Sequence, residues 1–165
     1  MAALITEVQG PHRSAALALL KSDVEQATKL VLRYVDQIDR QLEVANTILD
    51  DLQPPRTGKI TVEWRRKEGR VLVSPVIWKS LRGGGWRYER VTHKRLTTRV
   101  KKSRDFYDVA DKVRIVVKVV SGLLEQRQNI IARVTNYKTG IAGVLHNAGP
   151  ITNAYEDWLQ EVREE

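Results

Sequence analysis

Apolar residues recur at seven-residue intervals along the N-terminal third of the chain. The positions in this register are Val24, Val31, Ile38, Ala45 and Leu52. Further apolar residues fill the adjoining rows, and this spacing predicts an amphipathic helix over residues 22–52. Ser22 and Glu25 have the spacing of a capping box, which predicts that the helix begins at Ser22. Pro54 and Pro55 follow, and proline ends a helix because it has no N–H to donate.

A second apolar stripe begins near Ser103 or Asp105 and runs to about Tyr137 with three- or four-residue spacing. Its members are Phe106, Val109, Val113, Val116, Val117, Val120, Leu124, Ile131 and Val134. Residues 113–120 are rich enough in β-branched side chains to form a strand, but the period continues beyond them and favours a helix over residues 105–137. Two stripes of similar length predict an antiparallel helical hairpin.

Glycine and proline mark the C-terminal segment. Gly140, Gly143 and the Gly149-Pro150 pair predict an irregular connector. Asn153 with Glu156 has the pattern of a helix N-terminus. A short C-terminal helix is therefore expected after the connector.

Between the two helical stripes the period changes to two. Residues 59–65 alternate strictly between apolar and polar, which predicts a strand with one buried face. Gly69 suits a tight hairpin turn, and residues 71–78 supply the returning strand. Pro75 cannot donate to a β-ladder, so this second strand is expected at a sheet edge or with a bulge. Residues 86–91 and 95–101 predict a third and a fourth strand.

The predicted fold class is α+β. An antiparallel β-meander of three or four strands is inserted between two long helices that pack as a hairpin, and a short C-terminal helix follows. The length of 165 residues suits a single domain. We expect this domain to comprise an N-terminal helical part (residues 1–55), a basic β-meander (residues 56–104) and a C-terminal helical part (residues 105–165).

Positive charge is confined to the centre of the chain. The net charge is +8, yet residues 56–104 carry 16 basic and 3 acidic residues, and the flanking parts have net charges of −3 and −2. Arginine outnumbers lysine by 10 to 6 in this centre, which favours bidentate contacts with phosphates or bases. The positive charges on such a surface repel one another and destabilise the fold until a polyanion binds. Nucleic acid is the commonest polyanion.

We therefore predict a non-enzymatic nucleic-acid-binding protein that contacts phosphates with a basic sheet face and hairpin loops. The sheet face is expected to carry Lys59, Arg65, Arg95, Arg99 and Lys101. The candidate contact residues are Arg65, Arg66, Lys67, Arg70, Arg82, Trp86, Arg87, Tyr88, Arg90, Lys94, Arg95, Arg99, Lys101 and Lys102.

The tryptophans of the centre have two interpretations. Trp86 and Tyr88 follow three glycines and are candidates for stacking on bases. Trp64 shares its face with Ile60 and Val62, so we expect it in the core, and we expect the same of Trp78. The pattern leaves open whether the nucleic acid is DNA or RNA, and single- or double-stranded.

No catalytic residue, metal ligand or cofactor site is predicted. The chain has no cysteine, and its histidines are scattered singly without zinc-ligand spacing. Gly83-Gly84-Gly85 precedes a strand and lacks the Gly-Lys-Ser/Thr of a phosphate-binding loop, so it is interpreted as a hairpin loop. No segment resembles a membrane span or a targeting signal, and a cytoplasmic location is expected.

A structural or adaptor protein is the competing hypothesis. Apolar stripes on helices need partners, so residues 22–52 and 105–137 could form a homo-oligomer. In that case the basic sheet would meet an acidic protein surface instead of nucleic acid.

Overall fold

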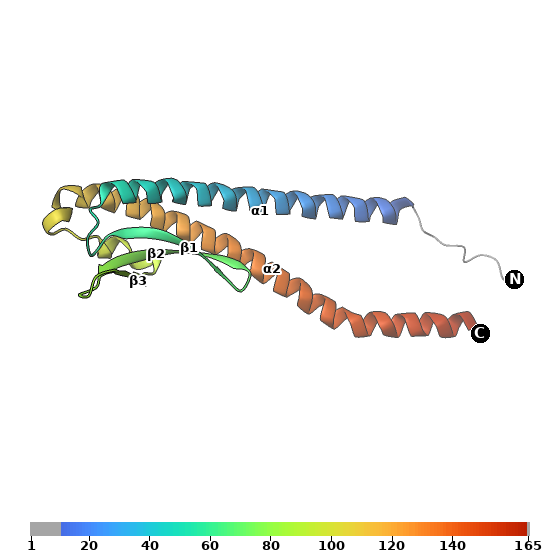
Figure 1. Cartoon of the computed structure of the whole chain (residues 1–165). Helices are drawn as coiled ribbons and strands as arrows, with labels where there is room; N and C mark the ends of the chain where they lie inside the picture. The colour runs from blue at the N-terminus through green and yellow to red at the C-terminus, as the bar shows by residue number, and fades with distance from the viewer. Residues whose placement is uncertain (1–10, 165) are drawn as a thin grey trace. The chain divides into compact units, whose positions relative to one another are not determined.

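The computed structural model describes residues 11–164 of the chain, with side chains described for residues 15–150 and for four later positions in the last helix. The elements are α1 (Pro11–Leu52), β1 (Ile60–Lys67), β2 (Arg70–Ser80), β3 (Trp86–Arg90) and α2 (Ala110–Glu164), with three short 3₁₀ segments between β3 and α2 (Figure 1). The predicted α+β class, with two long helices and an antiparallel sheet between them in sequence, is confirmed. Contacts divide the chain into two units, Met1–Leu123 and Leu124–Glu165.

Helix α1 ends where the sequence predicts and begins earlier. It runs to Leu52, just before Pro54. The predicted start at Ser22 is wrong, because the helix already begins at Pro11 and Ser22 lies in its interior. Residues 15–20 are all alanine or leucine, which are among the strongest helix formers. High helical propensity upstream therefore outweighs a capping motif that suits a helix start.

The core of the first unit lies in the second half of α1, the sheet and the start of α2. On α1 the buried apolar side chains begin only at Ile38 and recur at Leu42, Ala45 and Leu49. On α2 they continue the predicted stripe, and residues 113–120 are helical. These α2 side chains are Ala110, Val113, Val117 and Val120, preceded by Phe106 in the 3₁₀ segment η3 (Arg104–Val109). The two helices form the predicted hairpin.

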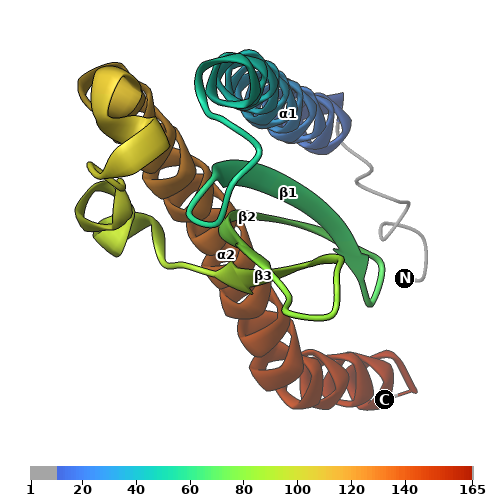
Figure 2. The ribbon, with the colours of Figure 1, turned by 60° about the vertical axis from the view of Figure 1, so that its left-hand side comes forward.

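The sheet has three antiparallel strands in the order β1-β2-β3. Glu68 and Gly69 both have positive φ, 52° and 72°, which is the backbone of the tight turn expected between β1 and β2. In Figures 1 and 2, β1 lies next to α1, and β2 and β3 follow on the side away from it. The predicted meander therefore exists with three strands.

The predicted fourth strand is wrong. Its residues form two 3₁₀ segments, η1 (His93–Arg95) and η2 (Thr97–Arg99). Leu96 and Val100 are buried while Thr98, between them, is exposed. Leu96 and Val100 are four residues apart, and both a strand and a helical turn can place two such residues on the same side. The short alternating pattern of residues 95–101 therefore did not distinguish a strand from helical turns.

The placement of β2 also differs from the prediction. Pro75 suggested an edge strand or a bulge, but β2 is the central strand. The last β2–β3 pair is Val76 with Arg90, and Pro75 lies just beyond it, where its carbonyl accepts a hydrogen bond from the Val91 N–H at 3.0 Å. The missing proline N–H therefore interrupts the ladder only at the end of the shorter strand.

The C-terminal segment is one continuous helix. The predicted connector and short C-terminal helix are wrong, since α2 runs through Gly140, Gly143, Gly149 and Pro150 to Glu164. Isolated glycines weaken a helix by about 1 kcal/mol each without forbidding it, and alanine, leucine and valine separate them. The predicted Asn153 and Glu156 cap falls on side chains outside the described residues.

Candidate nucleic-acid interface

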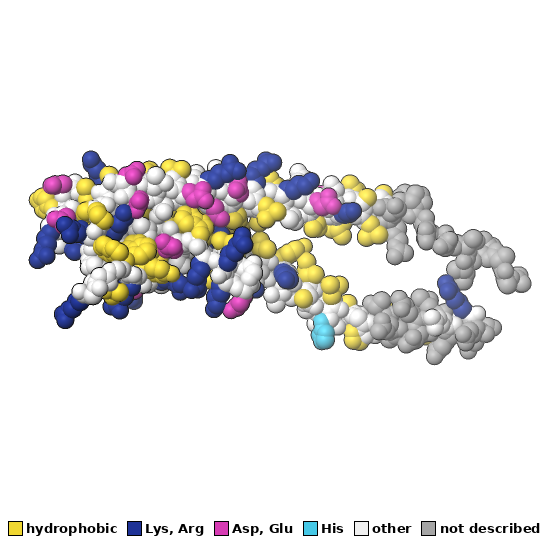
Figure 3. Space-filling view, in the orientation of Figure 1, with side chains coloured by type: hydrophobic (Ala, Val, Ile, Leu, Met, Phe, Trp, Pro, Cys, Tyr) yellow, Lys and Arg dark blue, Asp and Glu magenta, His cyan; other side chains and the backbone are white. Residues whose placement is uncertain are grey.

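One face of the sheet combines aromatic and basic side chains. Strand register places alternate residues of the three strands on this face, which we call the aromatic–basic face. Its members are Thr61, Glu63 and Arg65 of β1, Leu72, Ser74, Val76, Trp78 and Ser80 of β2, and Trp86, Tyr88 and Arg90 of β3. Figure 3 shows hydrophobic side chains gathered over the sheet with Lys and Arg side chains around them.

Three aromatic rings on this face lie in adjacent register positions. Trp78 pairs across the strands with Tyr88, and their ring centroids are 5.4 Å apart in an edge-to-face arrangement. The Trp78 indole N–H donates to the Thr61 hydroxyl at 2.8 Å, which fixes the ring. The Arg90 guanidinium lies 5.9 Å from the Tyr88 centroid, a cation–π contact. Trp86 and Tyr88 remain 47% and 41% exposed.

Two neighbouring hollows open on the aromatic–basic face. The larger, with a volume of about 430 Å³, lies between this face and the end of α1. Its lining includes Asn46, Asp50, Lys59, Thr61, Glu63, Trp78 and Trp86. The smaller, of about 120 Å³, is lined in part by Arg65, Tyr88 and Arg90. Glu63 lines both, so the two hollows meet at this carboxylate.

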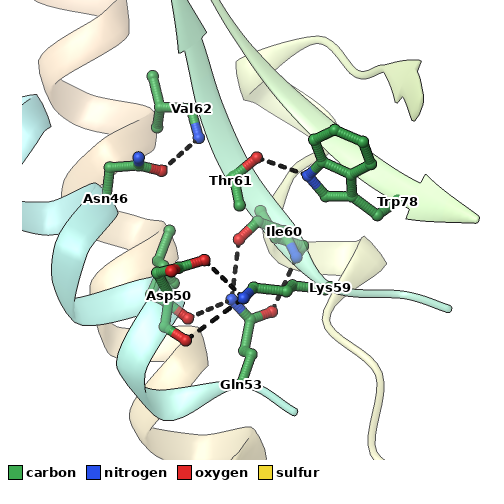
Figure 4. Close-up of polar contacts among 9 residues, drawn as sticks. Asn46, Asp50, Gln53, Lys59, Ile60, Thr61, Val62 and Trp78 are labelled. Carbon is green, nitrogen blue, oxygen red and sulfur yellow. Dashed lines mark hydrogen bonds and ion pairs between the residues drawn. The ribbon is translucent and has the colours of Figure 1, made fainter. Parts of the chain in front are cut away.

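Polar side chains of α1, and that of Gln53 just after its end at Leu52, hold the free edge of β1 and so position the larger hollow (Figure 4). Gln53 donates to the Ile60 carbonyl at 2.8 Å and accepts from the Ile60 N–H at 2.9 Å. Asn46 accepts from the Val62 N–H at 2.6 Å, and Lys59 forms an ion pair with Asp50 at 2.5 Å. An edge strand exposes such backbone groups to other strands, and here the helix satisfies them.

The predicted basic residues gather in three places. Arg65, Arg66, Lys67 and Arg70 are exposed at the β1–β2 hairpin, Arg82 lies in the loop before β3, and Arg87 and Arg90 are exposed on β3. The third group, on the 3₁₀ segments and the turn that follows, is exposed too and consists of Lys94, Arg95, Arg99 and Lys102.

The predicted single basic sheet face is wrong. Only Arg65 of its five members lies in a strand, because Lys59 precedes β1 and Arg95, Arg99 and Lys101 follow β3. Lys101 has a structural role: its Nζ donates to the Thr57 carbonyl at 3.0 Å and lies 5.3 Å from the Phe106 ring centroid. The cations therefore surround the sheet at its hairpin, its loop and its 3₁₀ segments instead of covering one face.

A local acidic group lies on the opposite face of β3. Glu89 forms an ion pair with Lys79. The hydrogen bond from Lys79 and its positive charge, with smaller contributions from Arg99 and Arg87, lower the pKa of Glu89 below its ordinary value of 4.5. Glu89 is therefore an anion that neutralises part of the local positive charge.

Sequence reasoning missed several residues of this site. Trp78 was expected in the core but is half-buried at the wall of the larger hollow. Asn46 and Asp50 on α1 and Gln53 just after its end are polar residues spaced by four and three, beside the apolar stripe. This row is a signal that the end of the helix meets a polar edge. His93 lies in η1, where its Nε2 is buried with no hydrogen-bond partner.

In the part of the chain that the structure describes, no three His, Asp or Glu side chains group as a metal site requires, and no helix is long and apolar enough to cross a membrane. No family model, curated protein or solved structure matches the chain.

Proposed function

We propose that this chain is a non-enzymatic nucleic-acid-binding protein whose exposed cations contact phosphates. The observation that carries the proposal is the unbalanced positive charge around the sheet. Of the 16 cations in residues 56–104, four lie within 4.0 Å of a carboxylate in the described structure, namely Arg56, Lys59, Lys67 and Lys79. Most of the remaining cations are arginines without an ion pair among the described residues.

The arrangement of these cations favours an extended polyanion over a small anion. They occupy a hairpin tip, a glycine-rich loop and a 3₁₀ segment, not one pocket. Apart from Lys101, these cations are exposed on the surface, so their charge is available to phosphates, and the release of counterions contributes to affinity. Arginine also presents a planar fork that matches phosphate geometry.

A salt-dependent titration tests this proposal. Binding of duplex and single-stranded oligonucleotides is measured by fluorescence anisotropy, starting at about 50 mM salt, where phosphate contacts are strong. Replacing Arg66 and Arg70 by glutamate at the exposed hairpin should reduce the slope of log affinity against log salt by about 1.8 for duplex or 1.4 for single strands. The matched control reverses Lys29 and Arg33, which are exposed on α1 outside the basic centre.

Two results would count against nucleic-acid binding. One is undetectable binding of every oligonucleotide at the lowest salt. The other is equal loss of affinity in the hairpin variant and the α1 control, which would show that binding depends on net charge alone and would count against the basic centre as the contact surface.

A second candidate function, self-assembly through α1, is favoured by a different observation. The seven-residue register that is buried at Ile38 continues toward the N-terminus through Leu17 and Val24, which are 57% and 47% exposed. Such a period is typical of helices that pair with other helices. If α1 pairs with a second copy, sedimentation should give a multiple of 18.9 kDa that falls to the monomer mass in a Leu17→Glu, Val24→Glu variant. An unchanged mass in this variant would exclude the α1 stripe as the interface, and an acidic protein partner for the basic centre would then be tested separately.

A further inference from the structure

We infer that the aromatic–basic face binds single-stranded nucleic acid, with unpaired bases stacked on Trp86 and Tyr88 and a base seated in the larger hollow. This inference rests on the proposed nucleic-acid binding and adds the class of substrate. It follows from the exposed rings, from the charge inside the hollow and from the position of the neighbouring cations.

Both rings are exposed, and Tyr88 is held by a neighbouring ring. Trp86 and Tyr88 alternate on β3, so both lie on the same side of the sheet about 6.8 Å apart along the strand. Tyr88 packs against Trp78, whose indole is itself fixed by Thr61. A ring held in this way loses little conformational freedom when a base stacks on it. The bases of a duplex are already covered on both faces by their neighbours, so such rings are useful only to unpaired bases.

The charge inside the larger hollow favours a base over a phosphate. Two carboxylates, Asp50 and Glu63, line it together with a single cation, Lys59, which is already paired with Asp50. The Glu63 carboxylate has no ion pair or hydrogen bond among the described residues and repels an anionic group. Its oxygens can instead accept hydrogen bonds from the amino group of a base. The volume of about 430 Å³ lies within the range of binding sites for organic ligands, about 300–1,000 Å³.

The cations lie where the sugar–phosphate backbone of such a strand must pass. Arg65 and Arg90 line the smaller hollow beside Tyr88, on the same face as the rings. Arg82 is exposed in the loop that leads into Trp86. A base turned toward the sheet places its phosphate outward, so phosphates at the rim meet arginines while the interior stays free of them. This separation of bases from phosphates requires an unpaired strand.

The test compares aromatic and charge variants on single and double strands. The probes are labelled DNA and RNA of about 16 nucleotides, the upper site size of comparable single-strand-binding folds, and a duplex of the same length. The variants are Trp86→Ala, Tyr88→Ala and Trp86→Phe, which retains a ring. The matched control is Tyr107→Ala, since Tyr107 is an aromatic residue that is 76% exposed and lies on η3, outside the three strands of the sheet.

We expect each alanine variant on β3 to weaken single-strand binding by roughly 5- to 150-fold, the effect of losing one stacked base. Duplex binding should be unchanged, Tyr107→Ala should have no effect, and Trp86→Phe should retain more affinity than Trp86→Ala. Circular dichroism of each variant checks that the helices and the sheet persist. Should Trp86→Ala lose its fold, the Trp86→Phe and Tyr88→Ala results decide the question.

The failure of this inference can be told apart from the failure of the proposed function. If the Arg66 and Arg70 reversal weakens binding while the aromatic variants do not, the chain binds nucleic acid but without stacking. Equal affinity for duplex and single strands would overturn the inference in the same way. If no probe binds at all, both proposals fail.

Discussion

Gln53 connects α1 to the edge of the sheet, and its removal should destabilise the protein strongly. The side chain is only 4% exposed. Its amide group donates to the Leu49 and Ile60 carbonyls, both at 2.8 Å, and accepts from the Ile60 N–H at 2.9 Å. Gln53→Ala therefore leaves both backbone polar groups of the fully buried Ile60 without their side-chain partner.

The cost can be estimated from these two backbone groups. A buried donor or acceptor without a partner costs about 1–3 kcal/mol, so two give about 2–6 kcal/mol. The Leu49 carbonyl still receives the Gln53 backbone N–H at 3.2 Å and adds little. Alanine leaves space through which water can reach Ile60, so we expect the lower part of the range, about 2–4 kcal/mol.

A second substitution separates hydrogen bonding from packing. Gln53→Leu keeps most of the side-chain volume but excludes water from Ile60, so it should cost at least as much as Gln53→Ala. If packing were the cause, leucine would be the milder change. The exposed Gln41 on α1 provides the control, since Gln41→Ala removes an amide from a solvated helix position.

Urea unfolding followed by circular dichroism measures the effect. For a slope of about 1–3 kcal/mol per molar urea, a loss of about 2–4 kcal/mol lowers the midpoint by about 0.7–4 M. Gln41→Ala should stay within about 0.5 kcal/mol of the wild type. The reasoning is refuted if Gln53→Ala also stays within that limit, or if Gln53→Leu is clearly the more stable of the two variants.

Three further predictions concern other parts of the chain. Gly58 has φ of +108°, and a Cβ there would lie 2.9 Å from the Lys101 side chain. Gly58→Ala should therefore lower the free energy of unfolding, measured with urea, by at least about 1 kcal/mol. An unchanged urea midpoint would contradict this positive φ. Glu89→Gln should remove a stabilisation that depends on pH. The folded-state pKa of Glu89 lies below its ordinary value of 4.5. The ion pair with Lys79 therefore contributes fully above pH 4.5 and is lost as the pH falls through the folded-state pKa. The gap in urea midpoint between wild type and Glu89→Gln should therefore narrow in acid and in high salt, and a gap that widens in acid would reverse the sign of the reasoning. Pro150 lies inside α2, so Pro150→Ala should restore a helical hydrogen bond and raise both helicity by circular dichroism and resistance to proteolysis in the C-terminal segment; lower helicity would show that proline is required there.

The elements with a strong local cause were predicted well from the sequence. Pro54 ends α1 in any context because it lacks the N–H that the helix needs. The Glu68-Gly69 turn joins two alternating runs at a position that tolerates positive φ. The long period of the second stripe identified residues 113–120 as helix although their β-branched side chains also suit a strand. In each case several residues, or one strict steric rule, supported the same structure.

The predictions that failed depended on a few residues whose effect depends on their surroundings. Ser22 and Glu25 fit a cap but lie within a helix that neighbouring alanines and leucines extend. Leu96 and Val100 fit both a strand and 3₁₀ turns. Pro75 is acceptable in the central strand only because β3 ends beside it, a fact about the partner strand that local pattern does not contain.

The sequence by itself determined the two long helices, the antiparallel meander between them and the concentration of positive charge in residues 56–104, but not the number of strands. These follow from periodicity, from the geometry of proline and glycine, and from composition, which are properties of neighbouring residues. The tertiary structure decided which cations remain free and which aromatic rings remain exposed. It turned Lys59 and Lys101 to structural contacts, placed Trp86 and Tyr88 beside Trp78, and brought α1 against the edge of β1. Those results depend on side chains far apart in sequence competing for the same space and the same hydrogen-bond partners, and only the folded chain brings them together.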